Sequence, residues 1–192
     1  MSQNMYQQVL QRMGLLNEGE DVRIDNEAKT KIKPVGESAA AVALAGLYHK
    51  ACSREGAMEL ASFLQARIRE LEKPNIGICL AITFGEQTNE VVAALSIYCH
   101  ADIKSAHHML YEACRCSLLV LHEELAGRDI RVEDVTQYMV AQRHHILSQL
   151  PADIQLGRLL GDTTIDDKTN KMDGPVSNIV HKIGESFSES PK

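Results

Sequence analysis

The stretch SAAAVALAGLYHKAC, residues 38–52, predicts the type of fold, because six of its fifteen residues are alanine. Alanine has the highest helix propensity of all residues, so we expect a helix here. Ser53 follows as a well-placed N-cap for a second helix over 54–73, whose apolar residues recur at helical spacing. Pro74 ends that second helix, since proline cannot continue a helix interior. Two helices joined by one polar residue indicate a helical domain.

Helical patterns continue toward the N-terminus and beyond Pro74. Residues 2–16 place apolar side chains at helical spacing, with Ser2 as the expected N-cap. Residues 76–84 are apolar on nearly every side and include several β-branched residues, which also suit a strand. We expect a helix there, because the sequence offers no second strand to pair with it.

The second half of the chain repeats the helical pattern with clear boundaries. Asp102 is well placed as an N-cap, Gly127 as a helix stop, and Pro151 in a first helical turn. The expected helices cover 87–99, 103–126 and 132–149, and a short one follows Pro151. The fold class is therefore predicted to be all-α, a compact multihelical single domain of about seven or eight helices.

The domain organisation follows from the polar stretches. Residues 17–35 contain Gly19 and Pro34 and show no apolar period, so 1–35 are interpreted as an N-terminal helix and a polar linker. Residues 36–161 form the expected helical core domain. Residues 162–192 are expected to hold a polar loop, an amphipathic helix over 176–187 and a disordered tail.

Composition and charge exclude several classes of function. The net charge of −6 argues against general nucleic-acid binding, where Lys and Arg must neutralise phosphates. No apolar stretch approaches the roughly 18 residues of a membrane span, and residues 1–8 lack the features of a signal peptide. The five cysteines have no framework spacing, so we expect reduced, largely buried thiols in a cytoplasmic protein.

The densest group of reactive side chains lies between residues 99 and 122 and consists of Cys99, His100, His107, His108, Cys114, Cys116 and His122. Thiolate and imidazole are the ligands that zinc prefers. The pattern contains no C-x-x-C or H-x-x-x-H pair, and on a helix Cys114 and Cys116 point about 160° apart. We interpret the group as core cysteines and surface histidines, and we predict no metal-ligating residue.

Two other candidate sites are also weak. His144 and His145 are adjacent and so face different directions on a helix, which fits ordinary solvated histidines. The acidic loop lacks the ligand spacing and the central glycine of an EF-hand, so a solvated loop is expected at Asp162, Asp166, Asp167, Asn170 and Asp173. No nucleophile elbow, P-loop or dinucleotide fingerprint is present. The sequence therefore predicts no catalytic or cofactor-binding residue and no cofactor, and it leans away from an enzyme.

Three stretches resemble a known family: AVALAGLYHKACSREGAMELASFL at 41–64, the run beginning Phe84-Gly85-Glu86 within 84–125, and residues 138–161 with their closing Leu159-Leu160-Gly161. On these, residues 36–161 resemble the YidB-like family of uncharacterised bacterial helical domains, copies of which also occur ahead of OmpA-like domains. The resemblance implies a bacterial protein with an all-α multihelical fold. The family has no established activity or site residues.

The expected function is that of a non-enzymatic domain acting through protein–protein contact or self-association. The alternative is a small-ligand or metal-binding protein that uses the Cys/His-rich helix 103–126. The stripe over 176–187 favours the first reading, because Val176, Ile179, Val180, Ile183 and Phe187 recur at helical spacing beyond a polar loop of some fifteen residues. Since that loop is long, we expect the stripe to contact a second molecule. We predict neither nucleic-acid binding nor membrane insertion.

Overall fold

The protein is represented by a computed structural model, in which residues 4–16, 26–72, 76–125, 129–162 and 164–166 are described. Eight α-helices and three short 3-10 helices make up this part of the chain, and it contains no strand. The predicted all-α class is confirmed. The helices are α1 (Met5–Arg12), α2 (Asn26–Cys52), α3 (Arg54–Ala66), α4 (Ile76–Phe84), α5 (Thr88–Cys99), α6 (Ile103–Leu125), α7 (Val132–Leu147) and α8 (Leu156–Leu160), with η1 (Ile68–Glu72), η2 (Gly85–Gln87) and η3 (Ala152–Ile154) between them.

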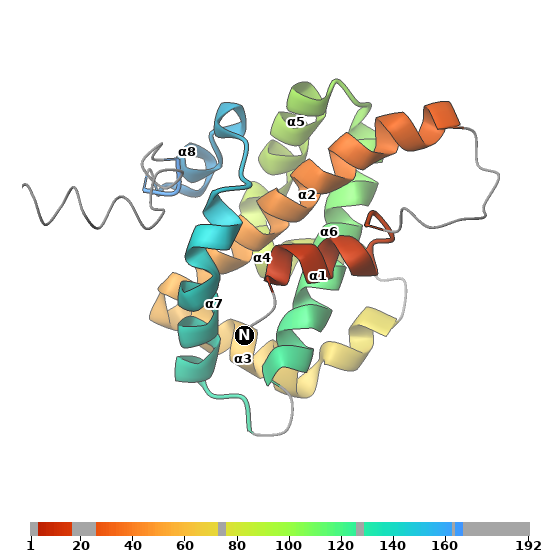
Figure 1. The fold of residues 1–192 in the computed structure, drawn as a ribbon. Coiled ribbons are helices and arrows are strands. Elements are labelled where there is room, and N and C mark those ends of the chain that lie inside the picture. Colours follow the sequence, from red (N-terminus) through yellow and green to blue (C-terminus); the bar gives the residue numbers. More distant parts are fainter. Residues whose placement is uncertain (1–3, 17–25, 73–75, 126–128, 163, 167–192) are drawn as a thin grey trace, which may run out of the picture.

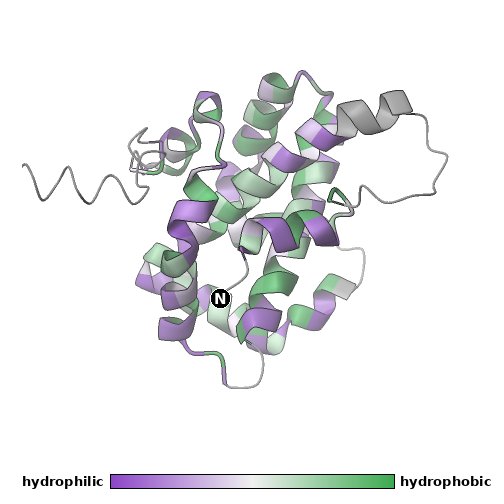
Figure 2. Ribbon diagram, viewed as in Figure 1, coloured by the Kyte–Doolittle hydropathy of each residue, from purple (hydrophilic) through white to green (hydrophobic). Residues whose placement is uncertain are grey.

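Helix α2 runs through the middle of the molecule, and the other long helices are arranged around it (Figure 1). It packs against α1, α3, α4, α5, α6 and α7, with its most extensive contacts on α6 and α7. Over residues 39–47 this helix has no solvent-facing side, so that stretch cannot be amphipathic. Its central stretch is accordingly pale or green throughout when the ribbon is coloured by hydropathy (Figure 2).

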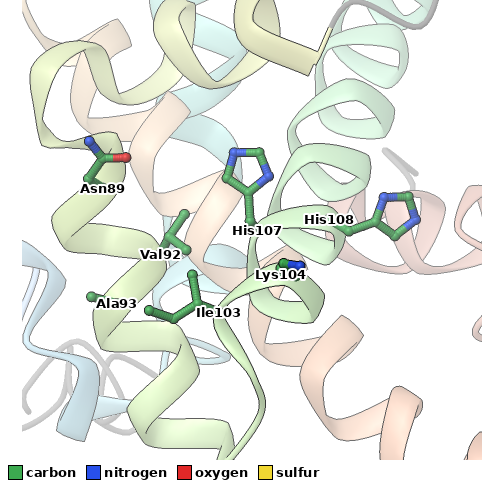
Figure 3. A pocket seen from close by; sticks show the side chains of 7 residues that line it. All are labelled: Asn89, Val92, Ala93, Ile103, Lys104, His107 and His108. Carbon is green, nitrogen blue, oxygen red and sulfur yellow. The ribbon is translucent and has the colours of Figure 1, made fainter.

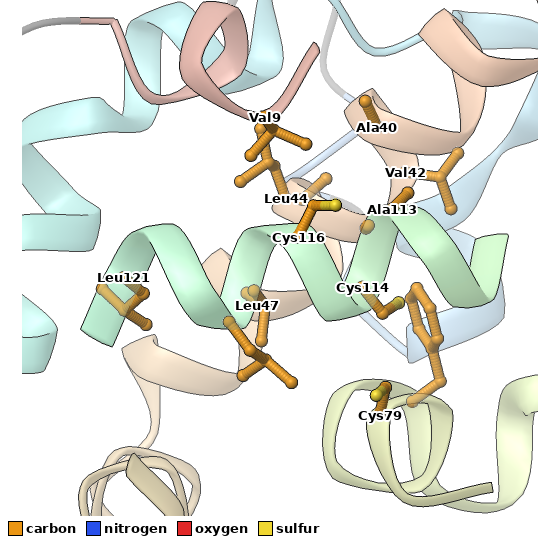
Figure 4. Packing of buried hydrophobic residues seen from close by; sticks show 14 of the residues in the cluster. Val9, Ala40, Val42, Leu44, Leu47, Cys79, Ala113, Cys114, Cys116 and Leu121 are labelled. Carbon is orange, nitrogen blue, oxygen red and sulfur yellow. The ribbon is translucent and has the colours of Figure 1, made fainter. Parts of the chain in front are cut away.

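The alanine-rich stretch explains why α2 occupies the centre. All nine consecutive residues from 39 to 47 are buried. Most of them are small, which lets neighbouring helices approach the α2 backbone closely, and Val42, Leu44 and Leu47 fill the remaining space. Figure 4 shows Leu44 and Leu47 of α2 beside α6, whose Ala113, Cys114 and Cys116 face the same core.

Helix α1 is attached to the core and ends where its sequence dictates. The N-cap is Asn4 rather than the predicted Ser2, and its side chain accepts a hydrogen bond from the Tyr6 N–H at 3.0 Å. Gly14 has φ +74°, a left-handed conformation that closes the helix. The Gly14 N–H donates to the Gln11 carbonyl and the Leu15 N–H to the Leu10 carbonyl. The Met5 N–H donates to the buried Gln142 Oε1 at 3.2 Å, which ties α1 to α7.

The predicted linker over 17–35 is wrong for its second half, because α2 begins at Asn26 and includes Pro34. The sequence argument relied on the missing apolar period and on the proline. A polar stretch with good helix formers can extend a helix that is already nucleated by a packed segment, since adding a residue is much easier than starting a helix. Val35 and Gly36 are already buried, so the packed part of α2 starts just after the proline.

The helix predicted over 54–73 divides into two elements. Ser53 is the N-cap as predicted, accepting from the Gly56 N–H at 3.0 Å, but α3 ends at Ala66. The 3-10 helix η1 follows and brings Leu71, 2% exposed, into the core. Pro74 lies outside the described residues. The next prediction, a helix rather than a strand over 76–84, is confirmed by α4.

The turn between α5 and α6 follows the sequence closely. His100 adopts φ 50°, and the His100 and Ala101 N–H groups donate back to Ile97 and Ser96, the pattern that closes a helix. Asp102 is the predicted N-cap of α6, with Oδ1 accepting from the Ser105 N–H at 3.0 Å. The predicted stop at Gly127 lies outside the described residues, and α6 ends at Leu125.

The described chain ends in a segment fixed to α8. Helix α7 and the short elements η3 and α8 confirm the helices expected over 132–149 and after Pro151. Asp166 Oδ1 and Oδ2 accept from the Gly157 and Arg158 N–H groups, each at 2.8 Å. Ile165 is 3% exposed and belongs to the core. The first part of the predicted polar loop therefore packs onto the domain, whereas the helix predicted over 176–187 and the tail lie outside the described residues.

Candidate functional site

A groove of about 590 Å³ lies between α5 and the first two turns of α6. Helix α5 contributes Asn89, Val92 and Ala93, and α6 contributes Ile103, Lys104, His107 and His108 (Figure 3). The side chains of Val92 and Ile103 point toward each other across the gap between the helices. The floor of the groove is apolar, and its polar groups come from Asn89 at one end and from α6 along one side.

Exposed apolar side chains gather at the same place. In the part of the chain with described side chains, the large exposed apolar residues are Leu16, Met58, Ile97, Tyr98, Ile103 and Val140, and three of these six lie within seven residues at the α5–α6 turn. Ile97 is 74% exposed and Ile103 is 61% exposed. Ile97 follows Ala93 by one helical turn, so it extends the α5 wall of the groove. Single exposed apolar residues are common, but a cluster beside a groove indicates a contact surface.

The polar side of the groove consists of a lysine and two histidines. Lys104 is exposed, and His107 and His108 follow it on the next turn of α6. No carboxylate is among the seven lining residues. The occupant that fits this surface best therefore has an apolar stripe. It carries no positive charge along the edge that faces α6.

The cysteines and histidines that are dense in the sequence between residues 99 and 122 lie at different places in the structure. Cys114 is fully buried and faces Cys79 and Thr83 of α4, whereas Cys116 is buried on the side of α1 (Figure 4). His107 and His108 line the groove, and His100 is exposed at the helix turn. Across the described residues, no three His, Cys, Asp or Glu side chains come together in a way that could hold a metal ion.

Burial makes most of the thiols poor nucleophiles. Burial raises the pKa of Cys79 to about 11, and it also raises the pKa of Cys99, Cys114 and Cys116 above its ordinary value. The reactive form of cysteine is the thiolate, which these raised pKa values make scarce at neutral pH. Cys79, Cys114 and Cys116 are buried, Cys99 is half-buried and Cys52 is exposed. The prediction of largely buried thiols is confirmed for three of the five.

These environments predict a simple thiol titration. At neutral pH the native protein should show one fast-reacting group, Cys52, a slower one, Cys99, and three more only after unfolding. A colourimetric thiol reagent measures the phases, and Cys52→Ser should remove the fast one alone. Three or more fast groups in the native wild-type protein would contradict this assignment.

The other two candidate sites have structural explanations. His144 and His145 are both exposed on α7, with ring centroids 5.9 Å apart. In the acidic loop, Asp162 Oδ1 accepts from the Thr164 N–H at 3.0 Å and the Thr164 hydroxyl at 2.6 Å. Asp166 caps α8, as described above, so both carboxylates hold backbone in place. Asp167, Asn170 and Asp173 lie outside the described residues.

Sequence reasoning missed the groove. It placed Ile97 and Ile103 in helices without noting that Ile97 falls off the buried face of α5, which is formed by Val91, Val92 and Leu95. Its position is a usable signal, because Ile97 is out of register with the buried apolar residues of α5. Ile103 gave no such signal, since it lies in register with the buried Ala106 and Leu110. Its exposure arises because neighbouring helices do not cover the first turn of α6.

No protein-family model, curated protein or solved structure matches this chain. The described helices include none with the length and apolar character that crossing a membrane requires.

Proposed function

We propose that this protein acts through protein–protein contact, by binding an amphipathic helix in the groove between α5 and α6. The observation that carries the proposal is the exposure of Ile97 and Ile103, 74% and 61%, beside an apolar groove. A helix that lays its apolar face into such a groove buries surfaces that are otherwise in contact with water. Burying an exposed isoleucine side chain contributes about 1.5–3 kcal/mol.

The size of the surface favours a single helix over a large interface. Seven residues line the groove, and Ile97 extends it by one turn. A stable protein–protein interface of standard size involves roughly 20–30 residues on each side. A short helix with one apolar stripe needs far fewer, so a helix is the occupant of matching size.

The setting of this function is part of the proposal. The resemblance of residues 36–161 to the YidB-like family supports a bacterial helical domain, and the missing catalytic motifs support a non-enzymatic one. Five free cysteines support a reducing compartment such as the cytoplasm. The alternative, a small ligand on the Cys/His-rich helix, retains one favourable observation: Lys104, His107 and His108 line a groove whose volume suits a small molecule.

Selection from a displayed library of amphipathic helical peptides tests the proposal on the full-length protein. Enriched peptides should bind the Ile97→Ser/Ile103→Ser variant at least about tenfold more weakly than wild type, because the loss of two buried isoleucines exceeds 1.4 kcal/mol. Both side chains are exposed, so the variant should keep the wild-type thermal stability.

Met58→Ser/Val140→Ser is the matched control, since these residues are 52% and 50% exposed on α3 and α7. Its peptide affinity should equal that of wild type. An equal loss in both double variants, or no enrichment at all, would refute a helix-binding groove. Enrichment of acidic small molecules, without peptides, in a parallel fragment screen would favour the small-ligand alternative.

A further inference from the structure

We propose that the groove has an occupant within the same chain, the stripe formed by Val176, Ile179, Val180, Ile183 and Phe187. This inference rests on the proposed function, because it takes the groove to be a helix-binding surface. The inference names residues 176–187 as one helix that binds in the groove. A partner protein would then have to compete with this segment for the same surface.

The last described residues lie on α8, and α8 packs against α5, one of the two helices that form the groove. Asp166 is held by two hydrogen bonds to the N–H groups at the start of α8, and Ile165 beside it is buried. Helix α8 and the preceding η3 both pack against α5. The remaining chain, residues 167–192, therefore starts from an anchored point on the neighbour of α5.

The length of the connection allows the segment to reach the groove. Nine residues, 167–175, join Asp166 to Val176. Fully extended, such a connection spans at most about 30 Å, several times the distance between the axes of packed helices. The sequence alone suggested a longer tether of some fifteen residues. Residues 161, 162 and 164–166 already belong to the described domain, so the reach is counted from Asp166.

The segment also matches the groove in length and chemistry. Residues 176–187 number twelve, the same as α5, so as a helix they would extend about 18 Å along it. At 100° per residue the five apolar side chains fall on one face, and Glu185 falls on the opposite face. The edge that would meet Lys104 and His107 then carries no lysine or arginine, since Lys182 lies far from the centre of the stripe.

The short connection over residues 167–175 favours binding of the segment to the groove of its own chain over binding to the groove of a second copy. A short flexible connection gives an effective concentration in the millimolar range, far above the usual concentration of a second molecule. The expectation of an intermolecular contact, drawn from the length of the whole loop, is therefore replaced by an intramolecular one. A partner helix must displace the segment. The apparent affinity of the partner therefore equals its intrinsic affinity multiplied by the fraction of molecules whose groove is open.

Methyl NMR of the full-length protein with labelled isoleucines tests the proposal. The Ile97 and Ile103 methyl groups should show cross-peaks to Ile179 and Ile183, and their shifts should change in the Ile179→Ser/Ile183→Ser variant. Diluting the labelled protein with excess unlabelled protein should leave the cross-peaks at full relative intensity. Loss of the cross-peaks on dilution would overturn the intramolecular contact in favour of exchange between copies.

Two controls make the result specific. Ser177→Ala/Lys182→Ser alters the polar face of the same segment and should leave the Ile97 and Ile103 signals unchanged. The Ile146 methyl, buried in α7, should be unchanged in every variant, which shows that the domain remains folded. Unchanged Ile97 and Ile103 signals in Ile179→Ser/Ile183→Ser would overturn the proposal.

Peptide binding separates this inference from the proposed function. Helical peptides selected on the wild-type protein should bind Ile179→Ser/Ile183→Ser at least about tenfold more tightly, because their competitor is lost. If peptides shift the Ile97 and Ile103 signals but bind both proteins equally, the groove binds helices and the segment is not its occupant. If no peptide shifts these signals, the proposed function itself fails.

Discussion

Replacing Leu44 with alanine is expected to lower the free energy of unfolding by about 3–5 kcal/mol, the upper part of the range for such substitutions. Leu44 is 0% exposed in α2, which packs against six other helices, and Figure 4 shows it between α1 and α6. The cost depends on how far the surroundings can collapse into the cavity. Around a central helix they are held from several sides, so little relaxation is available. Urea denaturation followed by circular dichroism measures the change.

Leu16→Ala is the matched control for this prediction. It removes the same three carbon atoms from a side chain that is 42% exposed at the end of the α1 segment. Its loss should be smaller, about 1–2 kcal/mol, because only part of this side chain is buried. Similar losses for Leu44 and Leu16 would contradict the central position of α2.

The second large effect is expected for Gly46→Ala, which should lower the free energy of unfolding by about 1–3 kcal/mol. Alanine has the higher helix propensity, so an exposed site would gain up to about 1 kcal/mol. At Gly46, however, an added Cβ would collide with Phe84 Cε1 and lie 3.0 Å from both Phe84 Cζ and Thr83 Cγ2. The packing of α4 against α2 depends on this close approach, and the buried Phe84 side chain would have to shift.

Gly77→Ala provides the control of opposite sign. Gly77 is exposed in α4, and no atom lies within 4 Å of the position that a Cβ would take. The substitution should leave the protein unchanged or raise its stability by up to about 1 kcal/mol. Thermal unfolding of the two variants should therefore move in different directions. A stabilising Gly46→Ala would show that α2 and α4 are not in contact at this point.

The sequence by itself determined the class of the fold and most of its boundaries. Ser53 and Asp102 were recognised as N-caps because a cap is a local interaction between a side chain and a backbone N–H two or three residues away. The helix over 76–84 was recognised because no partner strand existed. Local rules failed at Asn26, where a polar stretch without an apolar period belongs to α2 because a packed helix follows it.

The tertiary structure decided where each helix lies and which side chains remain in contact with water. The alanine-rich stretch predicted a helix, but its position at the centre follows from the packing of six helices around it. Half of the groove was beyond local reasoning: Ile103 has the register of the buried residues Ala106 and Leu110, yet it is 61% exposed. Periodicity fixes the direction in which a side chain points from its own helix, whereas burial depends on whether another helix is there to meet it.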